Sequence, residues 1–279
     1  MNATVVSLQR NAVHDAAMPS GRLWRAYWTE AKYETLRALR APAFAIPFLL
    51  LPLVLYVLIG VLLVGSMSHG DRRVAATMFA NWAVFGVMGP GMFGFGLYVA
   101  TEREQGLLKL KRAMPMPTAA YLLAKMAMTV LFAAIIMVSL IAAAVTLGHL
   151  RVTAGQYLLV TLIDILGSLP FCAIGFFIGT RSSGKSAPAF VNLAYLPIMH
   201  LGGLFYPLPR SVQPIEFFSP AFYLDKLGLR VLGALSLDEL SFGATGPSSH
   251  GGTWAYVAVL SGITLFFGVL GARRLRARG

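Results

Sequence analysis

The chain has 279 residues, of which 57% are hydrophobic and 12% are charged. Soluble domains typically carry about 25% charged residues, so this composition argues against a soluble enzyme and excludes a disordered or collagen-like chain. The single cysteine, Cys172, excludes a disulfide framework and a cysteine-rich zinc site. The net charge of +12 suits either a nucleic-acid-binding protein or a membrane protein with a basic cytoplasmic flank, and the positions of the charges distinguish these classes.

The segment before residue 41 divides into two parts. Residues 1–21 lack an apolar stretch of signal-peptide length and are expected to form a cytoplasmic tail. Residues 22–40 place apolar side chains at helical spacing, with most of the cations away from this stripe: Trp24, Tyr27, Trp28, Ala31, Thr35 and Leu39. This pattern predicts an amphipathic helix that lies in the membrane interface and leads directly into the first apolar run.

Six apolar runs are about as long as a transmembrane helix, which needs roughly 20 residues. They predict an all-α polytopic membrane protein in which residues 41–279 form a six-span transmembrane domain. The runs are Ala41–Gly65, Val74–Ala100, Thr118–Gly148, Gln156–Thr180, Ala187–Tyr206 and Trp254–Ala272. Prolines within four of these runs predict kinks, which neighbouring helices in a membrane bundle can compensate.

The distribution of basic residues orients the predicted spans. Six spans place both termini on one side, together with 17 of the Lys and Arg residues, and leave 6 on the other side. Basic residues gather on the cytoplasmic side of membrane proteins, so both termini are expected in the cytoplasm of a bacterial cell, with the chain in its cytoplasmic (inner) membrane. Since nearly all the net charge then lies on that flank, nucleic-acid binding is not expected.

The segment between the second and third runs has the charge pattern of a short helix. Glu102 and Glu104 stand at its start, where a helix N-terminus favours negative charge. Lys109, Lys111 and Arg112 stand at its end, where cations are favoured. The pattern predicts a helix at the cytoplasmic surface over residues 102–112, and by itself describes an ordinary solvated loop helix.

This segment also resembles the permeases of ABC-2-type exporters, which carry a pattern like E-R-E-R-G-T-L, then T-P, and later L-L-G-K. The matching residues are Glu102, Arg103, Glu104, Gly106, Leu108, Pro115, Leu122, Leu123 and Lys125. The departures are Leu107 for threonine, Lys111-Arg112 for a leucine pair and Ala124 for glycine, which imply a more basic surface toward a partner.

A second likeness to the same family follows the fifth run. The family patterns F-x-P-L and N-P-x-x-Y are matched by Phe205-Tyr206-Pro207-Leu208 and by Ser219-Pro220-Ala221-Phe222-Tyr223, with serine in place of the asparagine. Prolines and glycines interrupt residues 207–235 too often for a spanning helix. The resemblance implies that this region dips into the outer leaflet as a re-entrant helical segment between spans five and six.

The resemblance further implies a transport subunit that is not an enzyme. In this family two permeases pair, as two copies of one chain or with a related permease, and two separate ABC ATPase subunits bind beneath them. ATP and Mg²⁺ would then belong to the ATPase, and this chain would hold no cofactor or metal. Residues 102–112 would be the coupling helix, with contacts from Glu102, Arg103, Glu104, Gly106, Leu108 and Lys109.

One motif is interpreted as a chance match. Residues 179–186, G-T-R-S-S-G-K-S, fit the phosphate-loop pattern letter for letter. That loop works only after a buried strand and at the start of a helix, where backbone N–H groups hold phosphates. Here it follows a predicted span, so Gly184 is expected in a turn and Arg181 and Lys185 are expected to anchor that turn in the cytoplasm.

Five residues are candidates for the substrate pathway. Asp164 stands inside the fourth run, and intramembrane carboxyl groups are functional candidates, although Asp164 could equally pair with a neighbouring helix. The other four are aromatic: Phe205, Tyr206, Phe222 and Tyr223.

Three classes of function compete. An ATP-driven exporter permease for an amphipathic lipid-like or drug-like cargo is favoured, and a polysaccharide or glycolipid exporter with aromatic residues along a glycan channel is the alternative. A secondary transporter is less favoured, because it needs coupling-ion groups and usually an internal repeat. An intramembrane enzyme would need a motif such as H-E-x-x-H or a nucleophile elbow, and neither occurs here.

Overall fold

The computed structural model describes residues 20–108, 110, 118–209, 211, 213–242 and 252–277. Every regular element in this part of the chain is a helix, and no strand occurs in it, which confirms the all-α polytopic fold class. The predicted tail, residues 1–21, lies almost wholly outside the described residues.

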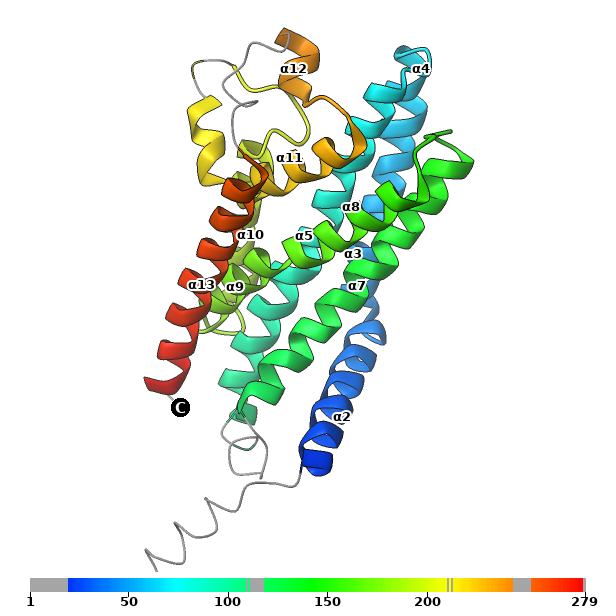
Figure 1. Ribbon diagram of the computed structural model, residues 1–279. Coiled ribbons are helices and arrows are strands. Elements are labelled where there is room, and N and C mark those ends of the chain that lie inside the picture. The colour runs from blue at the N-terminus through cyan, green and yellow to red at the C-terminus, as the bar shows by residue number, and fades with distance from the viewer. Residues whose placement is uncertain are drawn as a thin grey trace, which may run out of the picture.

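The helices form an elongated bundle (Figure 1). In chain order they are α2 (Ser20–Leu39), α3 (Pro42–Leu55), the π-helix η1 (Tyr56–Val64), α4 (Gly65–Met67), α5 (Arg72–Glu104), α7 (Thr118–Thr146), α8 (Ala154–Gly167), α9 (Leu169–Gly179), α10 (Ala187–Leu201), the 3₁₀ helix η2 (Gln213–Phe218), α11 (Pro220–Leu232), α12 (Leu237–Phe242) and α13 (Thr253–Ala277).

Five helical stretches in the described chain are long and apolar enough to cross a membrane. They are Pro42–Met67, Arg72–Glu104, Ala120–Thr146, Ala154–Gly179 and Thr253–Leu275, and they coincide with five of the predicted runs. The remaining run, Ala187–Tyr206, contains only the 15-residue helix α10. A helix of that length rises roughly 22 Å, less than the roughly 30 Å of a hydrocarbon core. The six-span count therefore stays a prediction.

Prolines accompany a change of helical geometry in two of the four runs where the sequence predicts kinks, whereas Pro90 lies within the continuous helix α5 and Pro197 within α10. Pro47 and Pro52 lie inside α3, and the chain then continues as the π-helix η1. The fourth stretch breaks at Ser168, and Pro170 occupies the first turn of α9. Proline cannot donate the helical hydrogen bond, so these positions locally change the helical geometry.

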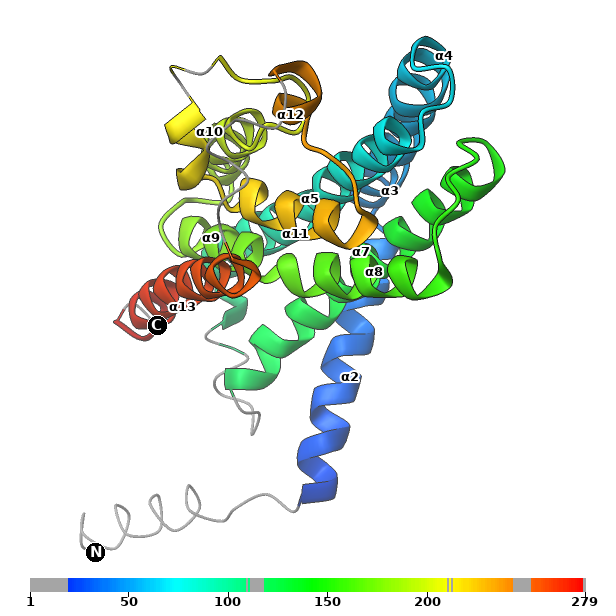
Figure 2. The ribbon, with the colours of Figure 1, turned by 45° about the horizontal axis from the view of Figure 1, so that its top comes forward.

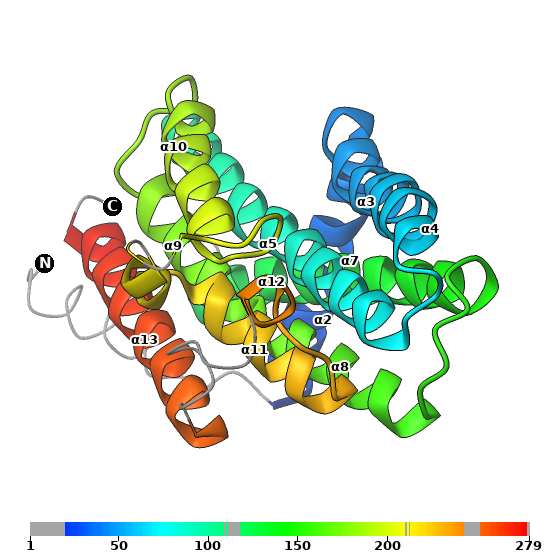
Figure 3. The ribbon, with the colours of Figure 1, turned by 90° about the horizontal axis from the view of Figure 1, so that it is seen from above.

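Helix α5 occupies the centre of the bundle, and α3 and α13 lie at opposite margins (Figure 3). In the apolar stretch of α5, 83% of the residues are buried, against 17% for the stretches that contain α3 and α13. The two marginal helices thus expose apolar side chains over most of their length, as is typical of helices that face lipid or another membrane chain.

The contact between α5 and α9 depends on the absence of side chains at two glycines. A Cβ on Gly175 would lie 2.3 Å from the carbonyl oxygen of Met92, and one on Gly179 would lie 2.7 Å from that of Gly96. These glycines form the G-x-x-x-G spacing that lets two helices approach closely in a membrane.

At one end of the bundle, α11 crosses the long helices and is buried along most of its length (Figure 1). Three polar side chains of α5 donate hydrogen bonds to backbone carbonyl groups around it: Arg72 to Leu232, Thr77 to Leu235 and Asn81 to Leu204. The region 207–235 contains two short helices, η2 and α11. Its re-entrant position in the outer leaflet stays a prediction.

At the opposite end, α2 extends beyond the bundle (Figure 2). Glu34 and Ala38 are buried, whereas Trp24 and Trp28 are 75% and 70% exposed. Exposed tryptophans are typical of helices at a membrane–water interface, so this exposure is compatible with the interfacial position predicted for residues 22–40.

A Gly175→Ala variant tests the close contact of α5 and α9. The added methyl group would meet the backbone of α5, and overpacking of this kind costs about 1–3 kcal/mol. The melting temperature of the purified protein in detergent should fall. Gly268→Ala is the matched control, because nothing lies within 4 Å of a Cβ at Gly268 of α13. Equal melting temperatures for the two variants would contradict the packing argument.

Candidate functional site

The last turn of α5 makes hydrogen bonds to several other parts of the molecule. Three consecutive residues, Glu102, Arg103 and Glu104, each reach a different set of partners. Successive side chains on an α-helix point about 100° apart. Adjacent residues of one turn can therefore bind separate elements.

Glu102 is the centre of a buried charge cluster. Its side chain is 1% exposed and accepts hydrogen bonds from Arg37 of α2 and from two residues of α7. The Tyr121 hydroxyl donates to Oε2 at 2.6 Å, and Lys125 Nζ donates to Oε1 at 3.2 Å. Helices α2, α5 and α7 are therefore joined through one carboxylate.

Lys125 links the same cluster to a second carboxylate. Its side chain is fully buried and donates to Glu34 of α2 as well as to Glu102. Its Nζ also lies 5.2 Å from the ring centre of Tyr98 and 5.0 Å from that of Tyr121. Aromatic faces attract cations, so the two tyrosines help to stabilise the buried ammonium group.

The cluster is electrically balanced. Glu34 and Glu102 carry two negative charges, and Arg37 and Lys125 carry two positive charges. Burial alone would lower the pKa of Arg37, but Glu102 and Glu34 outweigh this effect and hold the pKa above its ordinary value. Buried ions are tolerated only when they are paired and hydrogen-bonded in this way.

Arg103 and Glu104 bind the turn between α9 and α10. The Arg103 guanidinium donates to the carbonyl oxygens of Thr180 and Ser182, the latter at 2.6 Å. Glu104 Oε2 accepts from the backbone N–H of Gly184 at 2.6 Å. The turn predicted at residues 180–186 is therefore present, and it is held by side chains of α5.

This contact argues against a phosphate loop at residues 179–186. The segment follows helix α9 rather than a strand, and the Gly184 N–H that would face a phosphate instead donates to a carboxylate. A Cβ on Gly184 would lie 2.6 Å from that same oxygen, so the Glu104 carboxylate occupies the space beside this amide.

Two further residues of the predicted coupling segment serve its local structure. Gly106 has φ +73°, a left-handed conformation that glycine adopts without strain and that follows the end of α5. The predicted start of a helix at Glu102 and Glu104 is therefore wrong, because both residues lie in the last turn of α5 and a turn follows at 105–106. Leu108 is buried in a cluster with Phe95, Val99, Tyr121, Cys172, Phe176 and Leu275. Lys109 and residues 111–117 lie outside the described residues.

Of the predicted coupling residues that the structure describes, three face the rest of the molecule. Glu102 and Leu108 are buried, and Arg103 is partly covered by the turn it binds. Among the described residues of this segment, Glu104, Gln105 and Leu110 are exposed, the last at 61%. Of these three, Glu104 is a matched family residue, whereas Gln105 and Leu110 are not.

The predicted pathway carboxyl group, Asp164, lies in the contact between α8 and α11. It is buried, and among the described residues neither of its carboxyl oxygens has a hydrogen-bond partner. Asp225 of α11 lies within electrostatic range of it. No group of three or more His, Cys, Asp and Glu side chains in the described chain could hold a metal ion.

The four predicted aromatic residues fall into two separate clusters. Phe205 packs edge-on against Trp82 of α5, with 5.0 Å between the ring centroids. Tyr206 is 44% exposed, and its ring centroid lies 5.9 Å from that of His200. Phe222 and Tyr223 are buried beside Tyr256 of α13. The structure therefore does not bring all four to one surface, and their part in a pathway stays a prediction.

Sequence reasoning missed Glu34, Arg37, Tyr98 and Tyr121 as members of the charge cluster. Glu34 and Arg37 are spaced i, i+3 on α2, a spacing that places both on one helix face. This spacing is the local signal by which the pair could have been noticed, although the same helix carries other charged residues. Their partner Lys125 lies 91 residues from Glu34 in sequence, and no local pattern reveals such a contact.

Comparison with known proteins identifies the family. Residues 25–226 match the model of the ABC-2 type transporter domain. The chain belongs to the ABC-2 type transporter family. It is also similar to a protein of Bacillus subtilis (strain 168) named "Putative transport permease YvfS", with 26% identity over 194 residues that cover 68% of this chain and 78% of the relative. The matched region contains the whole charge cluster and the α9–α10 turn, so this ABC-2 permease has its candidate site inside the family domain.

A double-mutant cycle on Glu102 and Lys125 tests the cluster. Glu102→Gln or Lys125→Gln alone leaves an unbalanced buried charge, which typically costs about 3–5 kcal/mol. The double variant restores neutrality, so its loss of stability should be clearly smaller than the summed losses of the two single variants. Thermal unfolding of the purified protein measures the stability of all three variants.

The control for this cycle is Lys185→Gln, which removes one exposed charge. Substitutions at exposed positions usually change stability by no more than about 0.5 kcal/mol. Strict additivity of Glu102→Gln and Lys125→Gln would mean that the two side chains do not stabilise one another.

Proposed function

We propose that this ABC-2 permease is the membrane subunit of an ATP-driven exporter, and that residues 102–112 dock on a separate ATPase subunit. The observation that supports this most is the set of contacts made by the last turn of α5. Through Glu102, Arg103 and Glu104 this turn is bonded to α2, α7 and the α9–α10 turn. A displacement of the segment by a partner would therefore act on several helices together.

The proposed coupling separates two tasks along one short segment. The inward-facing residues Glu102, Arg103 and Leu108 transmit movement into the bundle, because each is bonded or packed against another helix or turn. The outward-facing residues Gln105 and Leu110 meet the ATPase, because their side chains are exposed. ATP and Mg²⁺ are bound by the partner, and this chain supplies no catalytic residue.

In the proposed assembly two permeases pair above two ATPase subunits, as two copies of this chain or with a related permease. The exposed apolar faces of α3 and α13 are compatible with such pairing. Both termini lie on the cytoplasmic face of the bacterial inner membrane, and the cargo is an amphipathic lipid-like or drug-like molecule. Export assays with a lipid analogue and with a glycan-linked lipid would separate this cargo from the polysaccharide alternative.

A Leu110→Asp variant tests the docking surface. Leu110 is 61% exposed, so its replacement should leave the fold intact while adding a charge to an apolar contact with the ATPase. We expect the variant to keep a normal melting temperature but to lose co-purification with the ATPase. Adding the variant to the purified ATPase should no longer change the rate of ATP hydrolysis.

Leu240→Asp is the matched control, because Leu240 is exposed on α12 at the opposite end of the bundle. It should change neither assembly nor hydrolysis. Normal assembly and normal hydrolysis of the Leu110→Asp complex would refute docking at residues 102–112. Charge reversal at Glu102 is unsuitable as a test, because a lysine there would join the cations of Arg37 and Lys125.

Single cysteines test the proposed orientation. In a Cys172→Ala background, Met67→Cys and Ser241→Cys should react with a membrane-impermeant thiol reagent on intact cells. Gln105→Cys should react only after the cells are opened. All three positions are exposed, so accessibility to the reagent depends on the side of the membrane. The reverse pattern of labelling would place the termini outside.

A further inference from the structure

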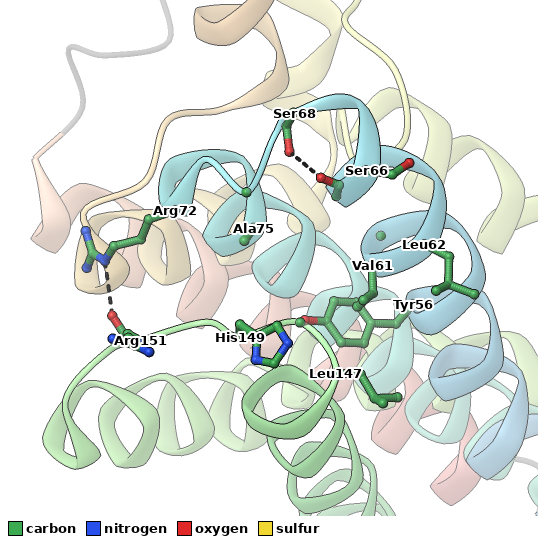
Figure 4. Close-up of a pocket in the computed structure, with 14 residues that line it drawn as sticks. Tyr56, Val61, Leu62, Ser66, Ser68, Arg72, Ala75, Leu147, His149 and Arg151 are labelled. Carbon is green, nitrogen blue, oxygen red and sulfur yellow. Dashed lines mark hydrogen bonds between the residues drawn. The ribbon is translucent and has the colours of Figure 1, made fainter.

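A second candidate site lies at the end of the bundle opposite to the charge cluster. A pocket of about 570 Å³ opens between η1, α4, the start of α5 and the loop that joins α7 to α8 (Figure 4). Its volume falls in the range of roughly 300–1,000 Å³ that is typical of small-molecule sites. None of the residues discussed above as coupling or pathway residues lines it.

The pocket is chemically two-sided. Arg72, Arg151 and His149 supply its polar part, whereas Val61, Leu62 and Leu147 supply apolar walls. Figure 4 shows Arg72 and Arg151 together on one side and Leu62 and Leu147 on the other. An amphiphilic ligand, with a polar head and an apolar tail, is the kind of molecule that such a division fits.

The polar part of the pocket is cationic. Two arginines line it, and its lining contains no carboxylate. Arg72 is held in place because its Nε donates to the carbonyl oxygen of Arg151 at 3.2 Å, and a second nitrogen donates to that of Leu232 at 3.3 Å. The Arg151 guanidinium makes no hydrogen bond or ion pair with any described residue. Arg72 is therefore fixed by its hydrogen bonds, whereas the donors of the neighbouring Arg151 guanidinium are free.

The apolar wall has an unusual backbone. Residues Tyr56–Val64 form a π-helix, a rare conformation that is frequent at functional sites. The Leu62 and Leu147 side chains are 59% and 52% exposed, so an alkyl chain laid along this wall would cover hydrocarbon that the protein itself leaves uncovered.

We propose that this pocket binds an anionic amphiphile. A phosphate or similar head group binds Arg72 and Arg151, since guanidinium groups match the geometry and charge of phosphate oxygens. The alkyl chain lies along η1 and Leu147. The proposal does not depend on ATPase docking, because the pocket and its test involve neither the charge cluster nor transport.

Protection of a cysteine in the pocket tests the proposal. Ser66 lines the pocket and is exposed, whereas the neighbouring Met67 is exposed but does not line it. In a Cys172→Ala background, Ser66→Cys and Met67→Cys are each modified by a maleimide in dodecyl maltoside, with and without dodecyl phosphate. The anionic amphiphile should slow modification at position 66 and leave position 67 unchanged.

Charge variants identify the head-group contact. Removing one charge-assisted hydrogen bond should weaken dodecyl phosphate binding about tenfold, measured as the concentration that half-protects the cysteine of the Ser66→Cys variant. Arg151→Gln should show this loss, and Arg72→Gln should show it as well. Arg73→Gln is the matched control, because Arg73 is an exposed neighbour on α5 that carries the same charge but does not line the pocket.

Further arms separate the sources of such a ligand. Inorganic phosphate alone should protect the Ser66→Cys variant weakly, because it lacks the chain, and zwitterionic dodecylphosphocholine should protect it less than dodecyl phosphate. In vesicles, protection that appears when phosphatidylglycerol is added to phosphatidylcholine would assign the pocket to an anionic bilayer lipid. Protection only by added dodecyl phosphate would assign it to a ligand from solution.

Three results would overturn the proposal. Equal protection at positions 66 and 67 would show general shielding by the micelle. Equal protection by dodecyl phosphate and dodecylphosphocholine would show that negative charge is not recognised. If Arg73→Gln weakened dodecyl phosphate binding as much as Arg151→Gln does, the result would show only a general attraction of anions to a basic surface.

Discussion

The pairing of the buried carboxylates Glu34 and Glu102 with Arg37 and Lys125 constrains one end of the whole bundle. Removing ions from water costs several kcal/mol for each ion, and the cost is offset only while the opposite charges stay in contact. The four side chains come from α2, α5 and α7. If α5 or α7 moved away alone, the remaining buried charges would no longer balance, whereas α2 contributes one charge of each sign. The ends of α5 and α7 are therefore expected to move together, and α2 is joined to them by the Arg37–Glu102 and Lys125–Glu34 pairs.

This constraint gives a physical reason for the order of residues in the E-R-E motif. The first glutamate is buried against α2 and α7, and the arginine and second glutamate hold the α9–α10 turn. Each position suits its partner: the buried carboxylate faces cations, the guanidinium faces two carbonyl oxygens, and the second carboxylate faces a backbone N–H. The motif thus describes an internal joint.

The sequence predicted the helical class and five of the long helices, because apolar length alone determines a membrane span. It also predicted the turn at Gly184, since a short polar segment joined two apolar runs. It could not predict that Glu102 is internal. The charge pattern of residues 102–112 is that of a surface helix, and the neutralising partners Arg37 and Lys125 are 65 and 23 residues away. Long-range pairing of this kind leaves no periodic signal.

Helix α5 connects this charged joint to the opposite end of the molecule. It spans 33 residues, or roughly 50 Å of rise. Near its start, Arg72, Thr77 and Asn81 donate to backbone carbonyls around α11, and at its end Glu102 and Arg103 bind α2, α7 and the α9–α10 turn. Both sets of bonds engage groups that are costly to leave unpaired. A shift of α5 along its axis would break its hydrogen bonds to Leu232 of α11 and to the loop residues Leu204 and Leu235 unless these groups moved with it, so α5 joins the two ends of the bundle directly.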